Sequence, residues 1–188
     1  LIHLSSGGVF SGRDSIGFGQ DVYYEKSMLS PSTFYGATKA AGEVINNKDI
    51  TIRSDFWGPD INTNGSGFFN WLLSQKGKVT GYDDIHFNGV SNLELCHFIE
   101  YLFENNLNGI VHLGAKNYIS KGNLLRLIKE IFNINIDIEG SSNMKSSIVL
   151  RNTFKCNYIE KTYEQMCIEL AKYVKSHIED YPYYNHYL

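Results

Sequence analysis

The sequence is poor in arginine, proline and cysteine, and it contains no long apolar run. It has 188 residues, of which 17 are Lys or Arg, and its net charge is -3. It therefore lacks the basic character of a nucleic-acid binder, and we expect no nucleic-acid partner. No apolar run approaches the roughly 18 residues of a membrane span, so no membrane association is expected. With 43% hydrophobic residues and 3 prolines, the composition is typical of a folded, soluble chain.

The cysteines and histidines show no spacing that is typical of a disulfide or metal site. Cys96, Cys156 and Cys167 lie far apart and form no CxxC pair, which is typical of free thiols in a reducing compartment. We therefore expect a cytoplasmic location. The six histidines show no HxxH or HExxH spacing, so no metal site is expected. His112 lies in an apolar segment and is predicted to be a core histidine.

The first 59 residues follow the order strand, loop, helix, strand. Residues 1–5 are apolar and end in small residues, and residues 6–30 are rich in Gly, Ser and Asp. Apolar positions recur at helical spacing over about 33–46, and residues 50–54 alternate as in a strand. This order is typical of a parallel α/β sheet. Because the sequence starts within the first strand and not with Met, we expect it to begin inside a domain.

Residues 60–188 have a different pattern, which predicts a smaller α+β lobe beyond a boundary near residue 59. Some of its segments are expected to return to the first sheet. Helices are predicted from 68, from the capping boxes that begin at Ser91 and Thr162, and from Ser120. Strands are predicted at 79–82, 109–113 and 134–138.

Tyr35 and Lys39 are four residues apart on the helix predicted in the first domain, so they lie on one face, one turn apart. A lysine beside a tyrosine favours the phenolate, which allows the phenol to act as an acid or base near neutral pH. With 13 Tyr in the chain, one such pair is expected by chance, so the spacing alone decides nothing.

The position of Ser6 gives this pair a context. Ser6 follows the first strand, and ligand sites in parallel sheets form at the carboxyl ends of strands. The helix that follows Pro31 can bring Tyr35 to the same edge. A serine hydroxyl and a phenol that both contact one carbonyl oxygen suit the reduction of a ketone.

These residues belong to a longer pattern. Its specific part comprises residues 5–12 (SSGGVFSG), Tyr24, Glu25, Pro31, residues 35–39 (YGATK), Gly42 and Glu43, with weaker matches at 53–58, 87–91, 109–113 and 120–121. The pattern resembles the extended short-chain dehydrogenase/reductases, within them the dTDP-4-dehydrorhamnose reductase branch. The resemblance implies an α/β fold, the C-terminal part of a Rossmann-type doubly wound parallel sheet with a smaller α+β substrate-binding lobe. It also implies NAD or NADP as the cofactor and a nucleotide-sugar substrate, and it allows a homodimer.

The resemblance also assigns roles to single residues. Tyr35 falls on the family's catalytic tyrosine, and Lys39 falls on the lysine that also binds the nicotinamide ribose. Ser6 falls on the hydroxyl position that contacts the substrate oxygen, with Ser5 as a weaker claimant.

Three further positions follow from the same resemblance. Arg151 lies where relatives often place an arginine near the nucleotide diphosphate, because its planar fork pairs with phosphate oxygens; a surface salt bridge is an equally good interpretation. Ser54 is assigned to cofactor binding. Arg53 is interpreted as a structural residue at a strand end, with contact to the ligand as the alternative.

The family's Gly-rich dinucleotide fingerprint is not found in this sequence. Neither Gly7-Gly8 nor Gly17-Phe18-Gly19 follows a strand and opens a helix in the required way. We therefore expect the fingerprint to lie upstream of Leu1 and the isolated chain to bind cofactor weakly.

The predicted function is NAD(P)H-dependent reduction of a nucleotide-linked 4-keto sugar, with Tyr35 as the proton donor. An epimerase or 4,6-dehydratase on the same scaffold is a competing interpretation, although Gly7 and Gly8 stand where a dehydratase usually has an acidic pair. The sequence is also compatible with a non-catalytic regulatory module and with a decayed, inactive gene product.

Overall fold

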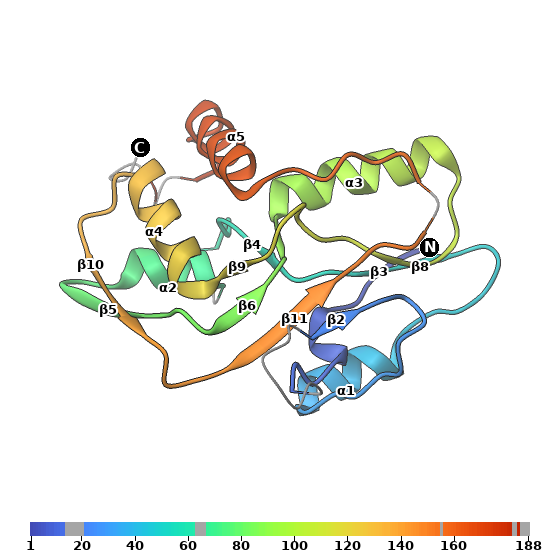
Figure 1. Ribbon diagram of the computed structural model, residues 1–188. Coiled ribbons are helices and arrows are strands. Elements are labelled where there is room, and N and C mark those ends of the chain that lie inside the picture. The colour runs from blue at the N-terminus through green and yellow to red at the C-terminus, as the bar shows by residue number, and fades with distance from the viewer. Residues whose placement is uncertain (14–20, 63–66, 155, 182–183, 185–188) are drawn as a thin grey trace.

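The computed structural model describes residues 1–13, 21–62, 67–154, 156–181 and 184 (Figure 1). The Gly17-Phe18-Gly19 segment lies outside this range. The helices are α1 (Phe34–Ala41), α2 (Phe68–Ser74), α3 (Asn92–Asn105), α4 (Lys121–Ile131), α5 (Tyr163–Ser176) and the short 3₁₀ helix η1 (Gly7–Val9). The strands are β1 (Ile2–Leu4), β2 (Val22–Tyr23), β3 (Ile50–Arg53), β4 (Phe56–Trp57), β5 (Lys78–Tyr82), β6 (Ile85–Phe87), β7 (Val90–Ser91), β8 (Gly109–His112), β9 (Ile119–Ser120), β10 (Asp137–Ser141) and β11 (Ser146–Leu150).

A parallel sheet in the order β1-β3-β8 places the carboxyl ends of its strands at one edge. Every residue of β3 is buried, as is typical of the central strand of a parallel sheet. The strands predicted at 1–5, 50–54 and 109–113 are confirmed. Since β8 pairs with β3, the sheet extends past residue 59, and the boundary predicted there stays a prediction.

A second sheet has the order β2-β11-β6-β9, and β5 pairs with β10 beside it. Strand β11 is not evident from the sequence, because its segment is short and begins with two serines. The strand predicted at 134–138 is partly wrong, because β10 begins only at Asp137. The Ile134 amide donates to the carbonyl of Lys129, so this residue closes the end of α4 and its side chain packs in the core.

Helix α1 is shorter than the predicted 33–46. Thr33 begins it by accepting a hydrogen bond from the Gly36 amide, and Gly42 ends it. Beyond Gly42, the amide and carbonyl of Val44 bond to Thr51 Oγ1 at 3.1 and 2.9 Å. The chain after α1 is therefore tied to β3 and does not continue as a helix.

The predicted helix starts are confirmed, but only one of the two capping boxes is complete. At Thr162 both reciprocal bonds with Gln165 are present. At Ser91 the hydroxyl accepts from the Glu94 amide at 3.1 Å, but the Glu94 carboxylate does not return to Ser91. It pairs instead with Tyr158 and Lys161, so tertiary contacts override the local motif.

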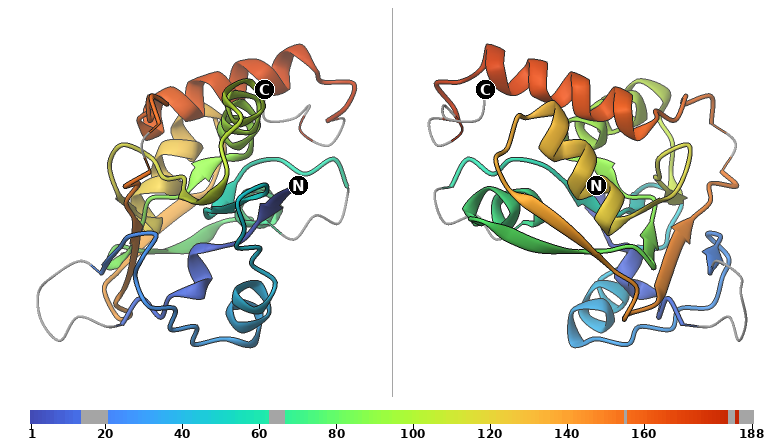
Figure 2. Two further views of the ribbon diagram at one scale, coloured as in Figure 1. Left: turned by 90° about the vertical axis from the view of Figure 1, so that its right-hand side faces the viewer. Right: turned by 60° about the vertical axis from the view of Figure 1, so that its left-hand side comes forward.

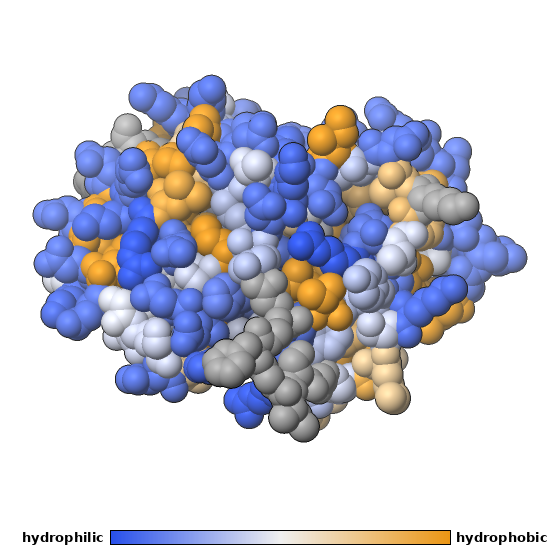
Figure 3. Space-filling model, viewed as in Figure 1, coloured by the Kyte–Doolittle hydropathy of each residue, from blue (hydrophilic) through white to orange (hydrophobic). Residues whose placement is uncertain are grey.

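Helices and strands from both halves of the sequence share one hydrophobic core. Helix α4 packs on α5 and β5, and α5 also packs on α3 and β7, as the two turned views show (Figure 2). The chain is thus a mixed α/β protein with parallel sheets. On the face seen in Figure 3, apolar side chains lie in separate patches among hydrophilic ones. None of the helices in the described ranges has the length and apolar character that crossing a bilayer requires.

Candidate active site

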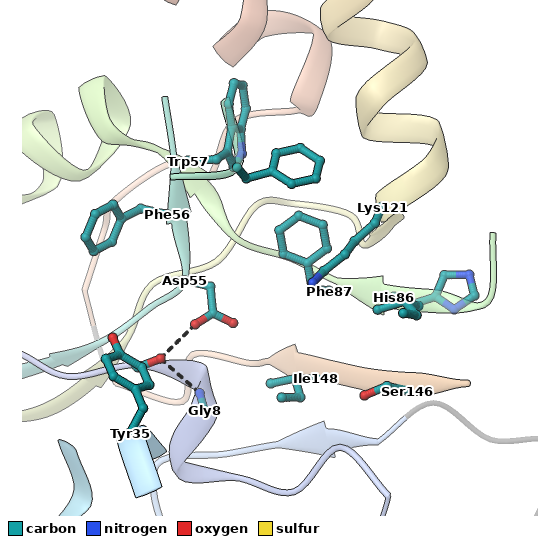
Figure 4. Close-up of a pocket in the computed structure, with 13 residues that line it drawn as sticks. Gly8, Tyr35, Asp55, Phe56, Trp57, His86, Phe87, Lys121, Ser146 and Ile148 are labelled. Atoms are coloured by element: carbon teal, nitrogen blue, oxygen red, sulfur yellow. Dashed lines mark hydrogen bonds between the residues drawn. The ribbon is translucent and has the colours of Figure 1, made fainter. Parts of the chain in front are cut away.

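A cavity of about 350 Å³ lies at the carboxyl ends of β1 and β3 (Figure 4). Ser6 reaches it from the turn after β1, Tyr35 from α1, and Asp55 from the turn after β3. Aromatic side chains, Phe56 and Phe87 among them, supply much of the remaining lining. The cavity is therefore a mainly apolar pocket with a few polar groups, as is usual for small-molecule sites.

Ser6 is held by bonds on both sides of its hydroxyl. It caps η1, where its Oγ accepts a hydrogen bond from the Gly8 amide at 3.0 Å. The same hydroxyl donates to Asp55 Oδ1 at 2.9 Å, and the Gly7 amide donates to that oxygen at 3.0 Å. Ser6 is 5% exposed. Its position is therefore set by the turn itself and by a carboxylate from the neighbouring strand.

Tyr35 stands at the mouth of the cavity on the first turn of α1. Its side chain is 59% exposed. The turn at Gly36 lies so close to η1 that a Cβ there would come within 2.1 Å of the Gly8 carbonyl oxygen. Glycine at this position lets α1 pack directly on η1, and this packing brings Tyr35 to the pocket that Ser6 lines.

Lys39 lies one turn behind Tyr35. Its Nζ donates to the Leu4 carbonyl at 2.9 Å, at the carboxyl end of β1. In the described structure this ammonium bonds to the backbone and not to the phenol. It is placed beside the cavity without being part of the lining.

Asp55 is the functional candidate that the sequence analysis missed. Burial raises the pKa of Asp55, and the hydrogen bonds from Ser6 and Gly7 and the charge of Lys121 only partly offset this. No ion pair to Asp55 occurs among the described residues. The signal was present in the sequence, because Asp55 directly follows a predicted strand whose end should meet Ser6. Only acids adjacent to Ser6 in the chain entered the sequence-based prediction.

The other predicted site residues lie outside the cavity lining. The buried Ser54 donates to the backbone carbonyl of Asp55 at 3.2 Å. Arg151 donates to the Lys116 carbonyl at 3.3 Å. Ser5, the weaker claimant, donates to Glu43 Oε1 at 2.7 Å. Among the described residues, the lysine that lines the cavity is Lys121, at the start of α4.

Arg53 and His112 lie in a buried polar network below the cavity. Arg53 binds both carboxylate oxygens of Glu43, at 2.8 and 2.7 Å, and its guanidinium is 3.4 Å from His112 Nε2. Burial lowers the pKa of His112 to about 4, which the charge of Glu25 only partly offsets. The structure agrees with both interpretations: Arg53 supports a strand end, and His112 is a core histidine that is 0% exposed.

A second group of titratable side chains lies on α3 and α5. Glu94, His97 and Glu169 place one ligand atom each within 4.8 Å of one another. The ammonium of Lys161 already bonds to Glu94 at 2.9 Å and to Glu169 at 2.6 Å. This lysine supplies the positive charge at the position that a metal ion would take.

Comparisons with known proteins identify the fold. No protein-family model and no curated protein matches the sequence. A dTDP-4-dehydrorhamnose reductase from Clostridium acetobutylicum is similar with a TM-score of 0.76 and 17% identity, over 93% of this chain and 65% of that one. The corresponding enzyme from Bacillus anthracis, in complex with NADP, is similar with a TM-score of 0.77 and 17% identity, over 94% and 65%. The chain has the fold of these reductases.

Other sugar-nucleotide enzymes share this fold at lower similarity. A dTDP-glucose 4,6-dehydratase from Bacillus anthracis, in complex with NAD, gives a TM-score of 0.64 at 15% identity, over 95% of this chain and 62% of that one. The chain thus spans about 65% of the length of the reductases that it matches. The predicted α/β fold class with a Rossmann-type parallel sheet is confirmed, whereas the separate α+β lobe stays a prediction.

Proposed function

We propose that this chain carries the catalytic edge and the substrate lobe of an NAD(P)H-dependent reductase of a nucleotide-linked 4-keto sugar. The observation that carries the proposal is the presence of Ser6 and Tyr35 on one cavity at the carboxyl ends of two parallel strands. Both hydroxyls can bond to one carbonyl oxygen, on which negative charge develops during reduction. The fold shared with solved sugar-nucleotide reductases supports the choice of substrate class.

Each residue of the site has a role in this proposal. Tyr35 donates the proton to the substrate oxygen, and Ser6 polarises that oxygen. Lys39 supplies positive charge one turn behind the phenol. Lys121, and not Arg151, supplies the cation for the substrate diphosphate, since Lys121 lines the cavity. Trp57 also lines the cavity, and its buried indole N–H has no hydrogen-bond partner among the described residues.

We assign Tyr35 and Lys39 to the nicotinamide ribose, since Tyr35 lines the cavity and the Lys39 ammonium lies one turn behind it, at the carboxyl end of β1. When bound, the cofactor would supply the hydride. The turn after β1 does not offer free amides to the diphosphate of the cofactor, because the Gly7 amide donates to Asp55 and the Gly8 amide donates to Ser6. A Gly-rich turn outside these residues would have to hold the diphosphate.

A second candidate is a 4,6-dehydratase or epimerase. The absence of an acid adjacent to Ser6 in the chain disfavours a dehydratase. Asp55 nevertheless reaches Ser6 in space, and a dehydratase shares the fold. A non-catalytic module of such an enzyme is the third candidate, and it predicts ligand binding without turnover. The homodimer and the cytoplasmic location stay predictions.

The test measures NADH and NADPH oxidation with a dTDP-4-keto-6-deoxy sugar, using both this chain and the complete product of its gene. Tyr35→Phe keeps the ring and removes the donated proton, so turnover should fall by about 100-fold or more. Tyr24→Phe is the matched control, since Tyr24 is 47% exposed and does not line the cavity. Equal turnover in the two variants, or no turnover despite cofactor binding, would overturn the reductase proposal. Conversion of the sugar without net oxidation of the cofactor would favour the epimerase or dehydratase.

A further inference from the structure

The hydroxyl of Ser6 points its proton away from the position where a ketone would need it. A serine hydroxyl has one proton to donate and two lone pairs that accept. One lone pair of Ser6 accepts from the Gly8 amide, and the proton goes to Asp55 Oδ1. What remains for a ligand is one lone pair, and a carbonyl oxygen is itself only an acceptor. In this state Ser6 and a keto substrate do not match.

One proton on Asp55 removes the mismatch without moving a heavy atom. As a carboxylic acid, Asp55 can donate to the second lone pair of Ser6 across the same 2.9 Å. The Ser6 proton can then turn to the cavity, while the Gly8 amide keeps its acceptor. The Gly7 amide also keeps Asp55 Oδ1 as its partner, at 3.0 Å, since a carboxylic acid retains lone pairs on both oxygens.

We propose that Asp55 is a positioning residue that sets the direction of the Ser6 hydrogen bond, and that its protonated form frees the Ser6 hydroxyl to donate to a substrate carbonyl. The proposal rests on the reductase function proposed above. No net proton transfer occurs at Ser6 or Asp55, since Tyr35 still gives the proton that the substrate oxygen gains. The ionised form of Asp55 leaves Ser6 an acceptor, which suits a hydroxyl ligand.

Burial favours the protonated form of Asp55, against the opposing effect of one nearby cation and two hydrogen bonds. Lys121 at the start of α4 faces Asp55 with a positive charge, which favours the carboxylate, Tyr163 at the start of α5 interacts with it, and Tyr35 and His86 share its cavity. Within the described ranges, its hydrogen-bond donors are the neutral Ser6 hydroxyl and Gly7 amide. Burial is the largest influence and raises the pKa of Asp55. A Cβ at Gly7 would lie 2.5 Å from Asp55 Oδ2, so the carboxyl group is also closely confined.

A direct test follows the titration of Asp55 and needs no turnover. Aspartate labelled with ¹³C at the side-chain carboxyl is incorporated, and the resonance missing in Asp55→Asn identifies Asp55. We expect a midpoint clearly above the ordinary value of about 4. Ser6→Ala should move it further up, because that variant removes a bond that stabilises the carboxylate. Asp83→Asn is the control, since Asp83 pairs with Arg126 outside the cavity lining, and it should leave the Asp55 midpoint unchanged. A midpoint at or below about 4, or one that does not respond to Ser6→Ala, would overturn the proposal.

A kinetic test then connects the titration with reduction. In the wild type, kcat/KM for the keto sugar should fall tenfold per pH unit above the Asp55 midpoint. Asp55→Asn cannot ionise and should lose this alkaline limb, whereas Asp83→Asn should keep it. A limb that persists in Asp55→Asn at the midpoint found by the resonance titration would also overturn the proposal, since loss of the Tyr35 proton gives a limb of its own. If no keto sugar is turned over at all, the proposed function fails, while the resonance titration still decides whether Asp55 and Ser6 are coupled as described.

Discussion

Two adjacent serines at the end of β1 donate to two carboxylates whose surroundings are opposite. Ser5 donates to Glu43, which also receives two bonds from Arg53. Burial opposes ionisation of Glu43, but the bonds from Arg53 and Ser5 and the charge of Arg53 more than offset it, so the pKa of Glu43 lies below its usual value. Ser6 donates to Asp55, to which no arginine or lysine bonds among the described residues, and burial raises the pKa of Asp55 more than the charge of Lys121 lowers it.

The difference separates a structural carboxylate from one placed for chemistry. The side chains of Glu43 and Arg53 are 2% and 3% exposed, and the pair contributes to holding α1 against β3. Asp55 lines a cavity and faces a hydroxyl that a substrate can reach. A buried carboxyl with a perturbed pKa in a cleft is a candidate for function, whereas a fully paired one is a candidate for structure.

The largest expected effect comes from breaking the structural pair. Arg53→Met leaves Glu43 buried without its cation, and we expect the free energy of unfolding to fall by about 3–5 kcal/mol. Arg126→Met is the matched control, because the Arg126–Asp83 pair is 39% and 34% exposed and should contribute less than about 1 kcal/mol. Urea unfolding of both variants measures the difference. Equal losses would show that burial does not distinguish the two ion pairs.

The second largest effect is a pH dependence of stability in the buried network around Arg53. His112 contacts Arg53, and burial lowers its pKa from 6.5 to about 4. The folded state therefore excludes a proton that the unfolded state binds. The free energy of unfolding should fall by about 3 kcal/mol from this residue as the pH drops from 6.5 to 4. His112→Gln should flatten this slope, and the exposed His177→Gln should not. An unchanged slope in His112→Gln would contradict the assignment.

The features that the sequence predicted are those encoded by neighbouring residues. Strands in the first domain, the helix that carries Tyr35 and the cap at Thr162 each depend on a local pattern, and local patterns are visible in one sequence. The place of Ser6 at the end of a strand could be predicted because Ser6 directly follows the first apolar segment. The shared fold confirms the architecture that these local patterns implied.

The features that the sequence missed depend on contacts between distant segments. Asp55 reaches Ser6 from 49 residues away, and Lys121 reaches the cavity from the start of α4. The capping box at Ser91 failed because Tyr158, 64 residues from Glu94, takes the carboxylate. Arg151, assigned from its residue type and position, does not line the cavity, and its role at the nucleotide diphosphate stays a prediction. Residue type and spacing predict what a side chain can do, but not which partner it meets.

The smallest expected effect comes from replacing each of the two carboxylates, Asp55 and Glu43, by its isosteric amide. Because the pKa of Asp55 is raised in the folded state, the folded protein is penalised at a pH above that value and not below the unfolded value of about 3.9. Asp55→Asn should therefore stabilise the protein at pH 8, on the order of 1 kcal/mol, and the gain should vanish near pH 3. Glu43→Gln should do the opposite, since the pKa of Glu43 is lowered. It should cost stability at pH 8, and the cost should shrink as the pH falls. Unfolding curves at pH 8 and pH 3 measure both changes in the free energy of unfolding. If both variants were stabilised at pH 8, or both destabilised, the two carboxylates would not differ as described.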